Sequence, residues 1–381
     1  PPRSTLFPYT TLFRSPYSLN GSTNTDRTNY FELVPSNYLE LMLYLEADRM
    51  GYLLPAMTQA KLDNQRDVVK NERRQNYENR PYGMASIKLG EMLYPDDHPY
   101  HWPTIGYQPD LTAAAMEDVQ GFFRRWYTPN NASLIVAGDV KPAEVRRLAE
   151  KYFGGVSKGE APAEILRRPA PLTADKRELL EDRVTLPQLQ VAWPTVSSWD
   201  ADDAAVGMLG QILGQGKSSR LFERLVYREQ KAQSVSVMSF GRELAGDFRV
   251  TVQAREGVPL TEMERAVLAE VGRLAEEGPT AEEVQRAYNS VEARFVYSLQ
   301  TLLGKADQLN NYQTFRGKAD LFTQDLARYR AVTAAEVKRV AAKYLRGQPK
   351  VVLSVVPEGK KELAAMGERS EEHTSELQSP I

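Results

Sequence analysis

Few residues of this sequence are of types that do chemistry. It contains three histidines, His98, His101 and His373, and no cysteine. A disulfide framework, a thiolate metal site and a cysteine nucleophile are therefore excluded. Glu72 lies in the charged run Lys70–Arg74, where composition alone favours a solvated helix face. A carboxylate on a helix is nevertheless one of the groups that can bind Zn²⁺.

Two of the histidines lie three residues apart, and that spacing could bind a metal only on a helix. Pro95 precedes His98, and Pro99 lies between His98 and His101. Prolines at these positions indicate a loop. No carboxylate–histidine pattern surrounds the pair. The sequence therefore predicts that both histidines pack within a loop.

The segment from Leu213 to Leu221, LGQGKSSRL, has some features of a phosphate-binding loop. That motif requires Gly-x-x-x-x-Gly-Lys-Ser/Thr after a strand. Here the first glycine is displaced by one position, to Gly210, and the preceding residues read as a helix. A nucleotide-binding function thus depends on this turn alone and is disfavoured.

Composition sets the broad class of protein. With 381 residues, 42% hydrophobic and 26% charged, the chain is expected to form two globular domains. The net charge of −2 and the pI near 6.1 give no indication of a nucleic-acid partner. No apolar run approaches 18 residues, so no membrane span is predicted. Composition does not distinguish cytoplasm from periplasm.

Helices and strands alternate in a pattern typical of the α+β class, with a mostly antiparallel sheet and helices on one face of it. In the first half we predict a strand at 29–34 and helices at 37–50 and 61–79. In the second half we predict strands at 188–193, 234–238 and 248–253, and helices at 201–213, 260–277, 281–303 and 334–345. Capping boxes are predicted at Thr261 with Glu264, Thr280 with Glu283, and Thr333 with Glu336.

The sequence also contains an internal duplication. A helix pattern at 112–127 precedes the apolar run 134–137, and a similar helix at 333–345 precedes the apolar run 351–356. We predict that each apolar run is a buried strand. We therefore predict two related domains joined by the Gly- and Pro-containing stretch 154–171.

The two ends of the chain differ from the remainder. Residues 6–15 and 369–379 read like translated sequencing adapters. Segments of this kind do not contribute to a fold, so His373, which lies in the second of them, is not expected to be a metal ligand. The predicted organisation is a tail at 1–15, domains at 16–160 and 161–368, and a second tail at 369–381. We expect the tails to add nothing to the core.

The segments 20–35, 45–50, 66–74 and 79–83 together resemble the insulinase/pitrilysin family of inverted-motif zinc peptidases, which includes the mitochondrial processing peptidase. Such enzymes carry His-x-x-Glu-His upstream of these segments. No histidine of this chain lies in that pattern. We expect the motif to fall about two dozen residues before Asn20 in a longer parent, of which this chain is a fragment.

The resemblance implies a zinc cofactor in the parent, where metal-bound water attacks a peptide bond. It assigns the third zinc ligand to Glu72 and places Gln65 where relatives often have a second carboxylate. It also places Asn24 beside a strand edge that can pair with an extended peptide substrate; an ordinary polar turn is an equal alternative for Asn24.

The resemblance further implies a partner. Longer relatives use an arginine and a tyrosine in a later module to bind substrate, and the corresponding residues here are Val226 and Gln233. A second peptidase module or a partner subunit would supply those groups. The predicted function is a fragment of a zinc-dependent metalloendopeptidase, inactive as it stands. The alternative is a non-catalytic member of the fold that serves as a binding or scaffolding subunit.

Overall fold

The computed structural model describes residues 19–160 and 166–366. The predicted tails at 1–15 and 369–381, with His373, lie outside the described residues. The chain divides into two compact units, each built from separate segments. The first contains Pro1–Arg73, Pro103–Ile165 and Glu292–Leu326; the second contains Arg74–Trp102, Leu166–Val291 and Ala327–Ile381.

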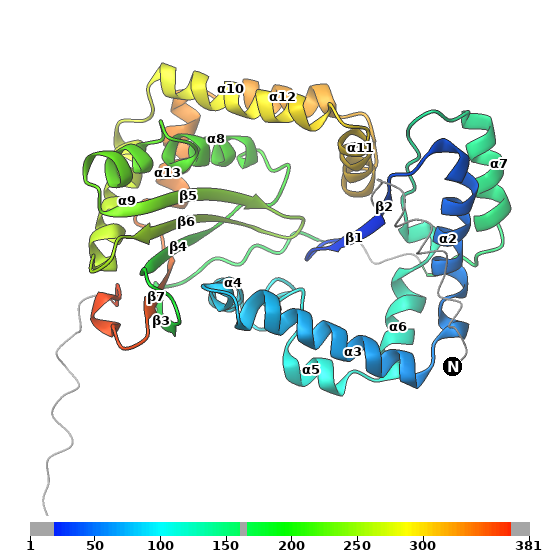
Figure 1. Cartoon of the computed structure of the whole chain (residues 1–381). Coiled ribbons are helices and arrows are strands. Elements are labelled where there is room, and N and C mark those ends of the chain that lie inside the picture. Colours follow the sequence, from blue (N-terminus) through cyan, green and yellow to red (C-terminus); the bar gives the residue numbers. More distant parts are fainter. Residues whose placement is uncertain (1–18, 161–165, 367–381) are drawn as a thin grey trace, which may run out of the picture. The chain divides into compact units, whose positions relative to one another are not determined.

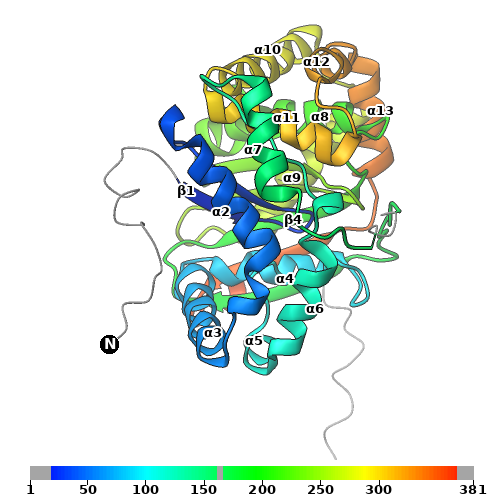
Figure 2. The same ribbon diagram turned by 90° about the vertical axis from the view of Figure 1, so that its right-hand side faces the viewer.

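The first unit contains one hairpin and several helices. Strands β1 (Leu19–Thr23) and β2 (Thr28–Glu32) pair antiparallel, with Leu19 opposite Glu32. The helices are α2 (Leu39–Tyr52), α3 (Gln59–Arg73), α5 (Gln108–Ala113), α6 (Met116–Trp126), α7 (Pro142–Phe153) and α11 (Leu302–Arg316). Helices α2 and α7 lie side by side (Figure 2), where Lys151 Nζ and the Tyr152 hydroxyl both donate to Glu40 Oε1.

The second unit is built on a five-stranded sheet of order β3-β7-β4-β6-β5. Its strands are β3 (Lys176–Asp182), β4 (Gln188–Thr195), β5 (Ala232–Gly241), β6 (Gly246–Ala254) and β7 (Val351–Pro357). Only β3 and β7 run parallel. Its helices are α4 (Gly83–Leu93), α8 (Asp203–Gly214), α9 (Leu260–Glu276) and α13 (Ala334–Tyr344). Helices α10 (Ala281–Ser298) and α12 (Phe322–Arg330) continue from one unit into the other.

Strand β7 is apolar on both faces, since every one of its residues is buried. Val351, Leu353 and Val355 pack with Leu89 and other apolar residues of α4. Helices α9 and α13 pack on β4, and Figure 1 shows α4 across the sheet from them. The α+β class and the mostly antiparallel sheet are confirmed, and α4 adds a helix on the second face.

Most predicted elements of the second half are found within a few residues, but two predictions were wrong. The helix predicted at 281–303 is two helices, because Thr301 caps a new one by accepting a hydrogen bond from the Gly304 amide at 3.0 Å. The strand predicted at 134–137 is irregular, and Leu134 is 50% exposed. An apolar run forms a strand only beside another strand, and within the described residues this run has no such neighbour.

The order of elements agrees with the predicted duplication. The hairpin β1–β2 is followed by α2 and α3, and the hairpin β5–β6 is followed by α9 and α10. Helices α2 and α9 begin at Leu39 and Leu260, 221 positions apart, and the matched residues Met116 and Val337 are separated by the same distance. The two compact units are defined by contacts and not by similarity between the halves of the chain. The division into two superposable domains at 154–171 therefore remains a prediction.

Two of the three predicted capping boxes are confirmed. Glu283 and Glu336 each accept a hydrogen bond from the amide of the preceding threonine cap at 2.8 Å, and the threonine hydroxyl accepts one in return. The capping box predicted at Thr261 was wrong. Helix α9 begins at Leu260, one residue before Thr261, and its N-cap is Pro259. Glu264 forms a buried ion pair with Arg177 instead, at 2.7 Å.

We expect Thr333→Ala to destabilise the second unit by about 1 kcal/mol, because an N-cap hydroxyl satisfies a helix amide that alanine leaves unpaired. Thr261→Ala is the matched control, since Thr261 caps no helix, and it should change stability by less than about 0.5 kcal/mol. Urea unfolding followed by circular dichroism measures both variants. Equal losses would show that the Thr333 cap contributes nothing specific.

Candidate metal centre and peptide-binding hairpin

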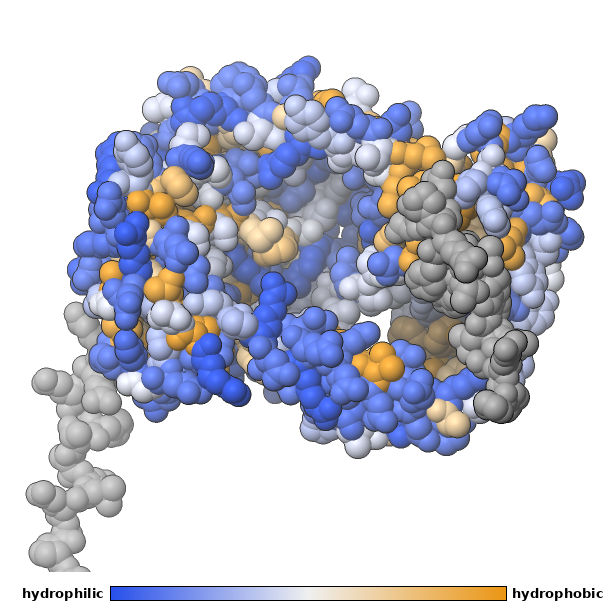
Figure 3. Space-filling model, viewed as in Figure 1, coloured by the Kyte–Doolittle hydropathy of each residue, from blue (hydrophilic) through white to orange (hydrophobic). Residues whose placement is uncertain are grey.

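Helix α3 carries Glu72, the predicted zinc ligand. The Glu72 side chain is exposed and forms no hydrogen bond or ion pair with any described residue. Gln65 lies seven residues earlier, on the same face of the helix, and is also exposed. Figure 3 shows a mostly hydrophilic surface over α3. The carboxylate is therefore available to bind a ligand.

Two arginines on another face of α3 hold the helix against the loop at 106–114. Arg73 is buried, and its Nη1 donates to the Gly106 carbonyl at 2.7 Å. Arg66 Nη1 donates to the Ala114 carbonyl at 2.9 Å. Because both bonds are made by side chains seven residues apart, they set the rotation of α3 about its axis. Glu72 lies about 100° around the helix from Arg73.

A complete zinc site is not formed by the residues present. Within residues 19–160 and 166–366, His, Asp and Glu side chains do not gather in threes at metal-binding distances. A catalytic zinc needs three protein ligands, and Glu72 alone offers one. The donor set of the described chain therefore does not fit a bound zinc ion.

The predicted loop packing of the two histidines is confirmed. His98 is fully buried, and its Nδ1 accepts from the Tyr100 amide at 3.0 Å. Its Nε2 therefore carries the hydrogen and donates to the Arg168 carbonyl at 2.9 Å. His101 Nδ1 bonds the Tyr94 carbonyl at 2.8 Å. Burial lowers the pKa of His98, so the ring is held neutral as a structural group.

Asn24, the predicted substrate-binding residue, lies in the turn of the hairpin. Its Oδ1 accepts from the amides of Asp26 and Arg27, both at 2.9 Å. The side-chain oxygen thus holds the turn, as the alternative interpretation expected. Among the described strands, β1 and β2 pair only with each other.

Sequence reasoning missed a group of charged and aromatic residues beside the hairpin. Glu32, at the end of β2, lies against Glu46 and Arg49 of α2. Arg49 Nη1 donates to Glu46 Oε2 at 2.8 Å, and its guanidinium lies 3.8 Å from the centre of the Tyr30 ring. The available signal was two carboxylates within the otherwise apolar segments 30–34 and 43–47.

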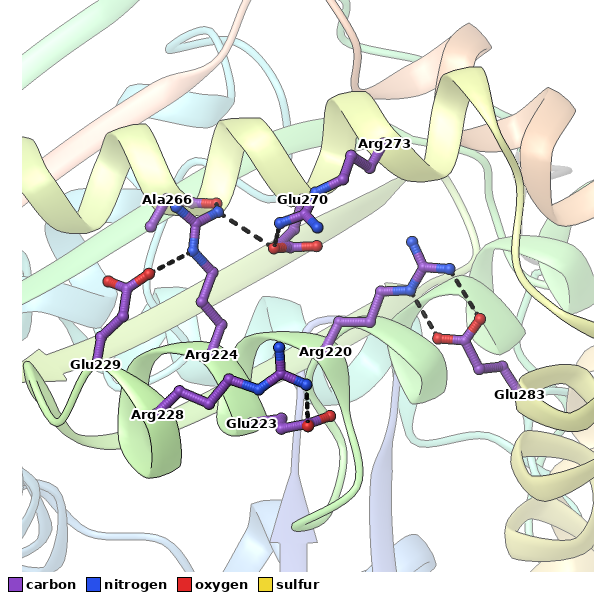
Figure 4. Close-up of polar contacts among 9 residues, drawn as sticks. All are labelled: Arg220, Glu223, Arg224, Arg228, Glu229, Ala266, Glu270, Arg273 and Glu283. Carbon is purple, nitrogen blue, oxygen red and sulfur yellow. Dashed lines mark hydrogen bonds and ion pairs between the residues drawn. The ribbon is translucent and has the colours of Figure 1, made fainter.

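The glycine turn after α8 is held by its own contacts. The Ser219 hydroxyl donates to the Gly216 carbonyl at 2.7 Å and so holds the turn closed. Arg220 pairs with Glu283 through two hydrogen bonds of 2.7 and 2.8 Å. Figure 4 shows the row of ion pairs that continues along η5 (Phe222–Arg228). The contacts of Ser219 and Arg220 therefore stabilise the turn itself.

The chain is similar to proteins of one peptidase family. Residues 114–291 match the family described as Peptidase M16 inactive domain. Zinc protease PqqE of Helicobacter pylori is 25% identical over 89% of this chain and 76% of its own length. A probable mitochondrial-processing peptidase subunit beta of Arabidopsis thaliana is 24% identical over 89% of this chain and 65% of its own length.

Solved structures share the fold. A protease from Helicobacter pylori gives a TM-score of 0.84 at 23% identity, covering 91% of this chain and 83% of that one. A peptidase M16 inactive domain from Pseudomonas fluorescens gives 0.79 at 20% identity, covering 92% and 82%. The predicted resemblance is confirmed: the chain is similar to M16 peptidases in sequence and in fold. None of its described helices is long and apolar enough to cross a membrane.

Proposed function

We propose that this chain is part of a zinc-dependent metalloendopeptidase and that Glu72 is one of its metal ligands. The observation that carries the proposal is the exposed, unpaired carboxylate of Glu72 on a helix whose rotation Arg66 and Arg73 hold. An exposed, unpaired carboxylate also fits a solvated helix face, and the resemblance to zinc peptidases favours the ligand role over that alternative. Names of the relatives, among them zinc protease PqqE, support the same reaction class.

The remaining ligands would come from outside the described residues. A parent extended upstream to include a His-x-x-Glu-His segment would bring two histidines to Glu72 and complete a set of three. In the same parent, an extended peptide would pair with an edge of the hairpin that Asn24 closes.

Zinc content tests this proposal directly. We expect the present chain, dialysed against Zn²⁺ and washed, to retain less than about 0.1 zinc per molecule, and the extended parent to retain about one. Elemental analysis measures the metal, and cleavage of a fluorogenic peptide library measures the activity. A folded, extended parent with an intact motif that holds no zinc would overturn the proposal.

The alternative is a non-catalytic subunit that binds or scaffolds a partner. It is favoured by the match of residues 114–291 to an inactive domain and by relatives that are themselves subunits, such as mitochondrial-processing peptidase subunit beta. The two functions differ in one measurement. If the extended parent is a non-catalytic subunit, it binds peptide without cleaving it, and cleavage appears only after the partner subunit is added.

A further inference from the structure

The carboxyl groups of Glu32 and Glu46 meet where the hairpin packs on α2. One oxygen of Glu46, Oε2, accepts the hydrogen bond from Arg49. The other, Oε1, is fully buried and receives no hydrogen bond from any N–H or hydroxyl of the described residues. Glu32 is half-buried and lies on the same face of β2 as Tyr30, whose ring centre is 3.8 Å from the Arg49 guanidinium, so the Glu32 carboxyl faces Glu46. A buried acceptor without a donor is costly, so the arrangement calls for a proton between the two carboxyls.

One arginine does not neutralise two carboxylates. If both Glu32 and Glu46 were ionised, like charges would face each other in a partly dehydrated site with only Arg49 to offset them. A proton on Glu32 removes one charge and supplies the donor that Glu46 Oε1 lacks. Burial, and then the hydrogen bond to Glu46, raise the pKa of Glu32 to about 8.

The other titratable groups of the cluster do not compete for this proton. The Tyr30 hydroxyl lies 2.7 Å from the Tyr127 hydroxyl, and burial raises the pKa of Tyr30 above its ordinary value. Tyr30 therefore stays neutral over the pH range in which Glu32 titrates.

We propose that Glu32 and Glu46 share one proton at neutral pH, and that its loss in alkaline solution releases the end of β2 from α2. The pair is thus a pH-dependent clasp between the hairpin and the helix. The proposal concerns packing of the first unit and does not depend on peptidase activity.

The direction of the pH effect follows from the raised pKa. The folded pKa of Glu32, about 8, lies above its ordinary value of 4.5. The stabilisation by the bound proton is therefore complete below about pH 4.5 and is lost as the pH rises through 8. Because the site is partly open to solvent, we expect a loss of about tenfold in the folding equilibrium constant between pH 6 and pH 9.

Urea unfolding of the whole chain at pH 6 and pH 9 tests the clasp with two variants. Glu32→Gln keeps the shape and always offers a donor to Glu46, so its stability should no longer fall specifically over this interval. Glu40→Gln is the matched control, because Glu40 lies on the same helix, pairs with Lys151 on the surface and should leave the wild-type loss unchanged. Equal alkaline losses in the wild type and in Glu32→Gln would overturn the proposal.

Two measurements on the unaltered chain complete the test. Infrared spectroscopy should show the band of a protonated buried carboxyl at pH 7 and its loss above pH 9. Hydrogen exchange at residues 28–32, corrected for the intrinsic effect of pH, should accelerate at least about fivefold over the same range in the wild type but not in Glu32→Gln. Absence of the infrared band at pH 7 would contradict the shared proton. Unchanged hydrogen exchange while the band is lost would contradict the release of β2 from α2.

Discussion

Glu72→Gln is expected to abolish zinc-dependent peptide cleavage in a parent chain that carries an upstream His-x-x-Glu-His segment. The amide keeps the shape of the side chain but removes the charge that binds the metal, and a zinc site left with two protein ligands holds the ion weakly. We expect at least a hundredfold loss of zinc affinity, with cleavage falling to background. Because Glu72 is exposed and unpaired among the described residues, the melting temperature of the metal-free protein should not change.

Asp67→Asn is the matched control for that variant. Asp67 is another exposed carboxylate on α3, and it lies about 140° around the helix from Glu72. Its replacement makes the same change in charge on a face that cannot reach the same metal. If Glu72→Gln cleaves peptide as well as the parent does, or if both variants lose zinc equally, Glu72 is not a specific ligand.

Asp247→Asn is expected to destabilise the second unit by about 3–5 kcal/mol, because it leaves two guanidinium groups without the carboxylate that neutralises them. Asp247 has no exposed surface, and Arg242 and Arg249 both form ion pairs with it. The Tyr94 hydroxyl donates to its Oδ1 at 3.1 Å. These contacts join the helix α4 region to the hairpin β5–β6 inside one unit.

A surface pair provides the comparison for Asp247. Arg183 and Glu358 approach to 4.0 Å with side chains 86% and 68% exposed, so Glu358→Gln should cost less than about 0.5 kcal/mol. Urea midpoints followed by tryptophan fluorescence report on the second unit, where Trp193 is fully buried. A loss below about 1 kcal/mol for Asp247→Asn would show that the arginines find other partners or water.

Local signals in the sequence predicted most helices and strands of the second half, and the N-terminal caps of α10 and α13. The alternation at 188–193 and the helical period at 260–277 predicted β4 and α9, since side-chain spacing reflects which face is buried. The capping box at Thr333 was also found, because its two hydrogen bonds lie within one helical turn. The segments at 20–83 were enough to indicate the peptidase family.

Tertiary structure decided what depends on distant partners. The apolar run at 134–137 has the composition of a strand, but strand formation requires a neighbour, and none is present in the described part of the chain. Glu264 does not take part in the predicted capping box, because it forms an ion pair with Arg177, which is distant in the sequence. The Glu32–Glu46 contact likewise exists only because β2 packs on α2.

The candidate site divides in the same way. The family resemblance of the sequence predicts Glu72 as a metal ligand, since residue type and motif are local properties. Tertiary structure decided that Glu72 is exposed and that Asn24 closes its own turn, because both depend on what surrounds each side chain. Burial and pairing depend on contacts between residues far apart in the chain, and a linear pattern does not contain them.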